Sequence, residues 1–137
     1  MRVVLDTNIL ISALLISGSV PDRLYQAWRD GRFELVTSED QLEEFRRVSR
    51  YPRLQRYLHS AEAGALVNEL RHLATVAKNL PTLSISKDAA DNFILGIAQA
   101  EKADYVVTGD HRGLLDLKKI GNLHIVNARQ MLTILDL

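Results

Sequence analysis

The sequence contains no cysteine among its 137 residues. This absence excludes disulfide bridges and thiolate metal sites, and it fits a protein of the reducing cytosol. No apolar run approaches the ~20 residues that a transmembrane helix requires. The glycine-rich patterns that bind nucleotide phosphates are also missing. We therefore expect a cytoplasmic protein with no membrane anchor, and no motif indicates a nucleotide cradle.

An excess of charge of either sign is absent too, because 17 Lys and Arg residues balance 17 Asp and Glu residues. Any nucleic-acid binding must therefore come from local patches. The segment RRVSRYPRLQRY, residues 46–57, holds five arginines with two tyrosines between them. Such a segment could hold RNA phosphates and stack bases. From sequence we favour a solvated helix face, or a contact with a partner protein or a second subunit.

What is present is an alternation of strand and helix patterns over a chain that is 47% hydrophobic. Apolar strands are expected at residues 2–5, 33–36, 105–108 and 124–126. Helices are expected at residues 8–15, 21–31, 38–51, 53–76, 88–100, 112–117 and 128–135. Strands that are apolar throughout are typical of a parallel sheet covered by helices on both faces. We predict one α/β domain over residues 1–137, a three-layer αβα sandwich with a mainly parallel central sheet.

Local signals refine two of these boundaries. Ser38 and Gln41 have the spacing of a capping box, which predicts a helix start. Pro52 is expected to end or bend that helix. The segment from 78 to 87 resembles a loop, with a short strand near Val76 or Leu83 as a further possibility.

Acidic residues follow two of the expected strands. Asp6 comes directly after residues 2–5, and Asp110 lies two residues after the strand at 105–108. The carboxyl ends of parallel strands meet at one edge of a sheet, where ligands bind in open α/β folds. We therefore expect both aspartates at that edge, although each could simply cap the helix that follows it.

Four more acids are expected at the same edge. Asp88 and Asp91 fall in the first turn of one helix, and Glu43 and Glu44 fall in the helix after the second strand. Taken singly, each acid has a simpler explanation: it caps a helix, interacts with the helix dipole or is merely exposed to solvent. As a cluster, two carboxylates ~4 Å apart would repel by about 4 kcal/mol at an effective dielectric constant near 20. A cation or protons must relieve that repulsion, and Mg²⁺ or Mn²⁺ suits oxygen ligands best.

A metal pair held by carboxylates can hydrolyse a phosphodiester, because one ion activates water and the other stabilises the leaving oxygen. Thr108 and Asn8 are candidate hydrogen-bond donors that orient the carboxylates or a water, although either side chain could instead satisfy local backbone groups. Lys87 and Arg112 adjoin the expected acids and are candidate contacts for the substrate phosphate. The four histidines show no ligand spacing, which disfavours zinc.

Four stretches of the sequence carry a resemblance to a known family: LDTNILISALL, SEDQLEEFRRV, DAADNFILGIAQAEKADYVVTGD and IVNARQML. Together they resemble the PIN-domain family, specifically the bacterial and archaeal toxins of toxin–antitoxin pairs, over essentially the whole chain. The resemblance implies a Mg²⁺- or Mn²⁺-dependent endoribonuclease that cleaves single-stranded RNA. It also implies the αβα sandwich, frequent homodimers and inhibition by a cognate antitoxin protein.

The resemblance also implies which side chains form the catalytic and metal-binding set: Asp6, Glu44, Asp91 and Asp110. Glu44 is preferred to Glu43 because it precedes the apolar residue of the family's E-[LF]-x-x-V pattern. Asp88 is expected to be accessory. The sequence departs from the family at Ala89, where proline is common, and in a slightly longer loop at 111–113. These departures affect the loop geometry and substrate contacts, and they remove no acid.

Two other functions remain open from sequence. A phosphatase of the haloacid-dehalogenase type would use Asp6 as a covalent nucleophile, but such enzymes have a second aspartate two residues later, where this chain has Asn8. A non-catalytic PIN-like module would bind a protein partner instead of cleaving RNA. The intact acids argue against that degenerate form.

Overall fold

The computed structural model describes residues 1–109 and 113–137. Their secondary-structure elements follow one another in this order: β1 (Arg2–Leu5), α1 (Thr7–Leu15), α2 (Val20–Arg29), β2 (Glu34–Ser38), α3 (Glu39–Ser49), α4 (Pro52–Gln55), α5 (Ser60–Leu73), β3 (Thr75–Ala77), α6 (Ala89–Ala100), β4 (Tyr105–Val107), α7 (Leu114–Leu117), β5 (Lys119–Ile120), β6 (Leu123–Val126) and α8 (Ala128–Ile134). No helix within the described residues is long and apolar enough to cross a bilayer.

The strands form one sheet in the order β3-β2-β1-β4-β6-β5. β1 lies inside the sheet, where Val3 pairs with Leu35 of β2 on one side and with Tyr105 of β4 on the other, both in parallel. The β5–β6 pair alone is antiparallel among the described pairings, and Gly121 takes a positive φ in the tight turn between these strands. The prediction of a mainly parallel sheet is confirmed, and the terminal hairpin is an addition to it.

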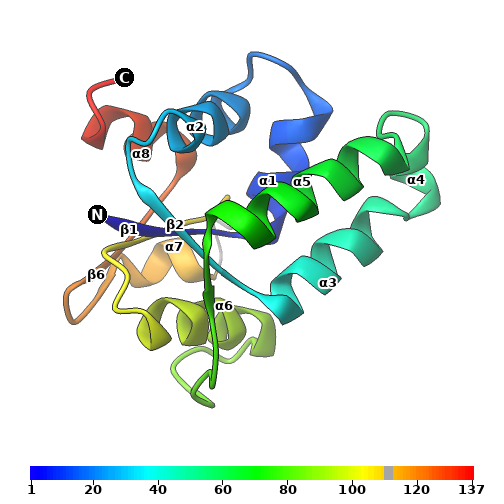
Figure 1. Cartoon of the computed structure of the whole chain (residues 1–137). Coiled ribbons are helices and arrows are strands. Elements are labelled where there is room, and N and C mark those ends of the chain that lie inside the picture. The colour runs from blue at the N-terminus through cyan, green and yellow to red at the C-terminus, as the bar shows by residue number, and fades with distance from the viewer. Residues whose placement is uncertain (110–112) are drawn as a thin grey trace.

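Helices cover both faces of this sheet and bury two separate apolar cores. Along β1, Val3 and Leu5 contribute to the core under α1, α2, α3, α5 and α8, whereas Val4 contributes to the core under α6 and α7. Successive residues of a strand point to opposite faces, so a strand buried on both faces must be apolar at every position. Figure 1 shows α6 on the opposite side of the sheet from α2, α5 and α8. The three-layer αβα sandwich is therefore confirmed.

Side-chain caps explain where several helices begin. Ser19 caps α2 and Ser38 caps α3, in each case by accepting a hydrogen bond from a backbone N–H three residues later. Asn127 forms a complete capping box with Gln130 at α8. The capping box expected at Ser38 is only half formed, because the side chain of Gln41 turns into the protein interior and bonds elsewhere.

The helical pattern expected at residues 53–76 is confirmed over α5 and the end of α4, but it is interrupted at residues 56–59 and ends at Leu73. The chain makes one helical turn in α4 and then begins α5 at Ser60. Val76 lies in β3, where it pairs in parallel with Thr37 of β2. The short strand considered near Val76 is thus confirmed, and Leu83 lies outside any strand. The helical pattern is misleading here because an edge strand of three residues has too little sequence to show a period of its own.

Candidate active site

Asp6 is held at the carboxyl edge of the sheet by its backbone and by one buried hydroxyl. Its N–H donates to the carbonyl of Val107, at the end of β4, over 2.9 Å. It occupies the N-cap position of α1, but its carboxylate does not cap that helix. Instead, the hydroxyl of Thr108 donates to Asp6 Oδ2 over 2.8 Å, and Thr108 is fully buried. Capping therefore does not account for the Asp6 carboxylate.

The surroundings of Asp6 raise the pKa of its carboxyl above the ordinary value. Burial is the largest cause, because it penalises the charged form. The hydroxyl of Thr108 and the backbone N–H of Thr7 oppose this effect by donating hydrogen bonds to the carboxylate. The negative charges of Glu44 and Asp91 raise the pKa further. Two carboxylates that are distant from Asp6 in sequence thus act on it in space.

Asp91 is positioned by the loop that precedes α6. Its side chain is buried, with 6% of its surface exposed, and Asp91 Oδ2 accepts a hydrogen bond from Ser86 Oγ over 2.9 Å. Asn92 holds Ser86 in turn, since its amide group bonds both the N–H and the carbonyl of Ser86 at 2.8 Å. Asp88 caps α6 by accepting from the N–H of Ala90 over 2.8 Å, as its simpler interpretation predicted.

The acids line one shared cavity of about 470 Å³. The site residues predicted from sequence that border it are Asp6, Asn8, Glu44, Asp88 and Asp91. Its remaining walls come mainly from α1 and the start of α6, together with Gly109 after β4. The cavity therefore lies where the carboxyl ends of β1 and β4 meet, at the predicted edge of the sheet.

The two adjacent glutamates of α3 face different surroundings. Glu44 is half-buried and borders the cavity, and its charge acts on Asp6. Glu43 is exposed, and its charge acts on Arg71 of α5. This arrangement agrees with the preference for Glu44, whose role as a ligand stays a prediction.

Comparison with known proteins agrees with this geometry. A family model described as "PIN domain" matches residues 2–112 of the 137. The chain belongs to the PIN domain family. It is similar to the uncharacterized protein MJ1680 of Methanocaldococcus jannaschii, with 25% identity over 131 residues, which covers 90% of this chain and 83% of that protein. No solved structure matches the chain significantly.

PIN domains are typically metal-dependent nucleases. The question for this PIN domain is whether the atoms that line its cavity suit a metal ion. The cavity offers carboxylate oxygens, the ligand type that Mg²⁺ and Mn²⁺ prefer. A bound cation would relieve the repulsion that Glu44 and Asp91 exert on the half-buried Asp6. Within residues 1–109 and 113–137, no three acidic or histidine side chains are close enough together to hold a metal ion. The predicted fourth acid, Asp110, lies outside the described residues.

Two predicted substrate contacts are not placed at this cavity. Arg112, like Asp110, lies outside the described residues. Lys87 is exposed and does not border the cavity. The substrate contact predicted for Lys87 is thus not supported at this cavity, and that of Arg112 stays a prediction.

Gln41 is a site residue that sequence reasoning took only for a cap. Its side chain is buried, accepts from the hydroxyl of Thr37 over 2.7 Å and donates to the carbonyl of Leu5 over 2.7 Å. A longer contact of 3.5 Å reaches the hydroxyl of Thr7. Gln41 thus joins β2, α3, β1 and α1 directly beneath Asp6. Its signal in the sequence is a polar side chain on the apolar face of a helix, one turn before Phe45.

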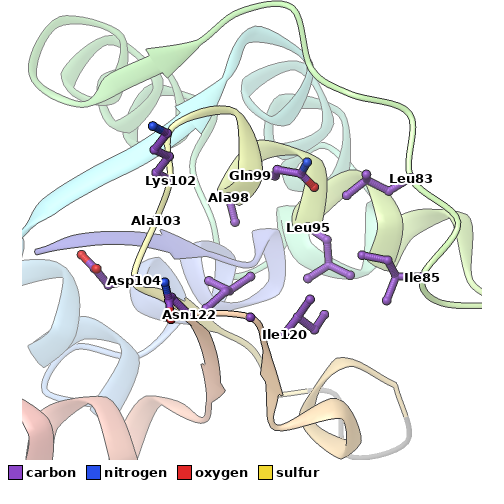
Figure 2. Close-up of a pocket in the computed structure, with 12 residues that line it drawn as sticks. Leu83, Ile85, Leu95, Ala98, Gln99, Lys102, Ala103, Asp104, Ile120 and Asn122 are labelled. Carbon is purple, nitrogen blue, oxygen red and sulfur yellow. The ribbon is translucent and has the colours of Figure 1, made fainter.

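A second cavity of about 470 Å³ lies between α6 and the β5–β6 hairpin. Figure 2 shows the apolar side chains of Leu83, Leu95 and Ile120 around it, with Lys102 and Asp104 at its rim. None of the predicted site residues that the structure describes borders this cavity. Its apolar walls offer no cation site, so we assign the chemistry to the acidic cavity.

Proposed function

We propose that this PIN domain is a Mg²⁺- or Mn²⁺-dependent endoribonuclease that cleaves single-stranded RNA. The observation that carries the proposal is the convergence on one cavity of the half-buried Asp6 with Glu44 and Asp91, whose charges raise its pKa. A cluster of this kind is stable at neutral pH when a cation neutralises it. Membership of a family of nucleases supports phosphodiester hydrolysis as the reaction.

In the proposed mechanism, the ligands are Asp6, Glu44, Asp91 and Asp110. The bound metal would supply an activated water and stabilise the leaving oxygen. Thr108 favours the ionised form of Asp6 through its hydrogen bond, and Ser86 fixes the orientation of the Asp91 carboxylate. Asn8 is exposed where α1 borders the cavity, and we assign it the orientation of water or of a phosphate oxygen.

The proposal is tested by cleavage of a fluorescently labelled single-stranded RNA. We expect cleavage with Mg²⁺ or Mn²⁺ and none in chelator. Asp6→Asn should reduce the rate by at least about a hundredfold, because a neutral amide binds a hard cation far less well than a carboxylate. Asp30→Asn, at an exposed position after α2, is the matched control and should cleave like the wild type. Undiminished cleavage in chelator, or by Asp6→Asn, would refute the mechanism.

The alternatives give different results in the same preparation. A phosphatase would form an acid-labile aspartyl-phosphate on Asp6 and would leave RNA intact. A protein-binding module would show neither reaction in any metal. The presence of Asn8 two residues after Asp6 speaks against the phosphatase.

We further propose that the enzyme acts as the toxin of a toxin–antitoxin pair, in the cytoplasm, as a homodimer inhibited by a cognate antitoxin. The support is the resemblance of the acidic motifs to that branch of the family. Induced expression should then stop growth, and expression of Asp6→Asn should not. Light scattering after size-exclusion chromatography gives the number of subunits. Unimpaired growth with abundant soluble wild-type protein would count against the toxin role.

A further inference from the structure

The segment of residues 46–57, which we name the arginine arm, is the most strongly positive stretch of the sequence. It contains Arg46, Arg47, Arg50, Arg53 and Arg56, and no acidic residue occurs between Glu44 and Glu62. The whole chain has a formal net charge of zero, so positive charge is segregated here. Segregated positive charge is the electrostatic signature of a polyanion-binding surface.

The arginines of the arm are available to a ligand. Four of the five are exposed, and Arg46 is half-buried near Glu39. The ion pairs formed among the described residues use other arginines, namely Arg2, Arg29 and Arg71. A charge that is already exposed, and that forms no ion pair with the described acids, gives up little when it binds a phosphate.

Exposed aromatic rings accompany these charges. Tyr51 and Tyr57 expose 39% and 66% of their surfaces. The guanidinium of Arg53 lies over the ring of Tyr51, 5.8 Å from its centre. Aromatic rings and arginine planes that stack bases, next to cations that hold the backbone, form the common surface for single-stranded nucleic acids.

The arm begins two residues after Glu44, which borders the acidic cavity. Glu44 borders the cavity from α3, and Arg47 lies three residues further along the same helix, which places the two on neighbouring positions of its surface. The separation of one helical turn is about 5.4 Å. Figure 1 shows α3 leaving the end of β2 and leading to α4 at the far end of the molecule. A strand bound at Arg47 would therefore lie about one helical turn from Glu44.

We propose that the arginine arm binds the single-stranded RNA beside the cleavage site, with phosphates on the arginines and bases stacked on Tyr51 and Tyr57. This assignment rests on the proposed nuclease function for the identity of the bound strand. Exposed rings favour RNA over an acidic protein partner, because every unpaired base offers a face to stack on them. A duplex buries those faces, so the arm should prefer unpaired RNA.

The test is the binding of a labelled, unstructured RNA in chelator, measured by fluorescence anisotropy across salt concentrations. Arg53→Gln/Arg56→Gln should weaken binding about tenfold and reduce the slope of log K against log salt by about 0.7 for each phosphate that an arginine no longer neutralises. Arg23→Gln/Arg129→Gln removes the same charge from exposed positions of α2 and α8, and it should bind within about twofold of wild type.

The stacking part of the proposal has its own variant. Tyr51→Ala/Tyr57→Ala should weaken binding about tenfold or more while the salt slope stays unchanged, because stacking releases no counterions. Both tyrosines are exposed, so circular dichroism should show an intact fold. A duplex of the same length should bind more weakly and respond little to this variant.

These experiments test RNA binding by the arm separately from RNA cleavage at the acidic cavity. If the Arg53/Arg56 and Arg23/Arg129 variants weaken RNA binding equally, the proposal that the arm binds RNA is overturned. It is also overturned if the arm variants keep wild-type affinity for RNA and bind an acidic protein less well. Asp6→Asn leaves the arm intact and should retain RNA binding. RNA that binds through the arm without being cleaved would support the arm and refute the nuclease.

Discussion

Asp6 is an acid of the cavity whose surroundings disfavour its charged form. Its carboxylate is half-buried near two like charges, and the hydrogen bond from the Thr108 hydroxyl is the largest influence that opposes the rise of its pKa. Residues that serve stability alone are seldom placed in this way, whereas perturbed acids gather at functional sites. The opposing hydrogen bond keeps the carboxylate available to a cation.

This environment predicts how stability depends on pH in the metal-free protein. The pKa of Asp6 is higher in the folded state than its ordinary value of 3.8. Between that ordinary value and the folded pKa, the folded state therefore binds more protons than the unfolded state. The free energy of unfolding therefore falls across that window and stays reduced above it. Asp6→Asn should be more stable than wild type at pH 7, with the difference disappearing in acid, in urea unfolding followed by circular dichroism.

Thr108→Val provides the opposing variant for the same measurement. It removes the hydroxyl that favours the ionised carboxylate, so it should lower stability at pH 7 more than in acid. If Asp6→Asn is no more stable than wild type at pH 7, burial among like charges is not what governs Asp6.

At the scale of elements, Gln41 joins four segments beneath the site. Gln41→Leu keeps the approximate volume but leaves the hydroxyl of Thr37 and the carbonyl of Leu5 without their partner, at a cost of about 1–3 kcal/mol each. We expect a lower urea midpoint with an unchanged m-value. Gln99→Leu, on the exposed face of α6, is the control and should change stability by less than about 0.5 kcal/mol. Equal effects of the two substitutions would show that the buried network contributes nothing.

The helices and strands show which parts of the fold could be predicted from the sequence and which could not. β1 and β6 coincide closely with the expected strands at 2–5 and 124–126, because apolar runs report local burial on both faces. The break between α4 and α5 and the two-residue strand β5 were missed, since both depend on pairing and packing with distant segments. Gln41 was mistaken for a cap because a capping residue and a buried crosslink have the same local spacing.

At the scale of the whole molecule, topology made the meeting of Asp6 and Thr108 predictable. The hydroxyl of Thr108 and the carboxylate of Asp6 are 102 residues apart in sequence, yet adjacent parallel strands bring them within 2.8 Å. That contact follows from placing two strand ends at one edge. The support of Asp91 by Ser86 and Asn92 could not be foreseen, because it depends on the path of a loop that no periodicity describes.

The two cores share one sheet, which predicts a single cooperative unfolding transition for residues 1–137. Trp28 lies in the core under α2, whereas helical circular dichroism reports on both faces. Fluorescence and circular dichroism should therefore give the same urea midpoint. Two separated midpoints would show that the faces unfold independently and would refute the prediction of one domain.

The central claim is that the cavity lined by Asp6, Glu44 and Asp91 binds a divalent cation, and calorimetric titration of the metal-free protein with Mn²⁺ tests it most directly. We predict saturable binding by the wild type, an affinity at least about tenfold weaker in Asp6→Asn, and an unchanged affinity in Asp30→Asn. Equal Mn²⁺ affinity in the wild type and Asp6→Asn, or no binding by either, would contradict the account.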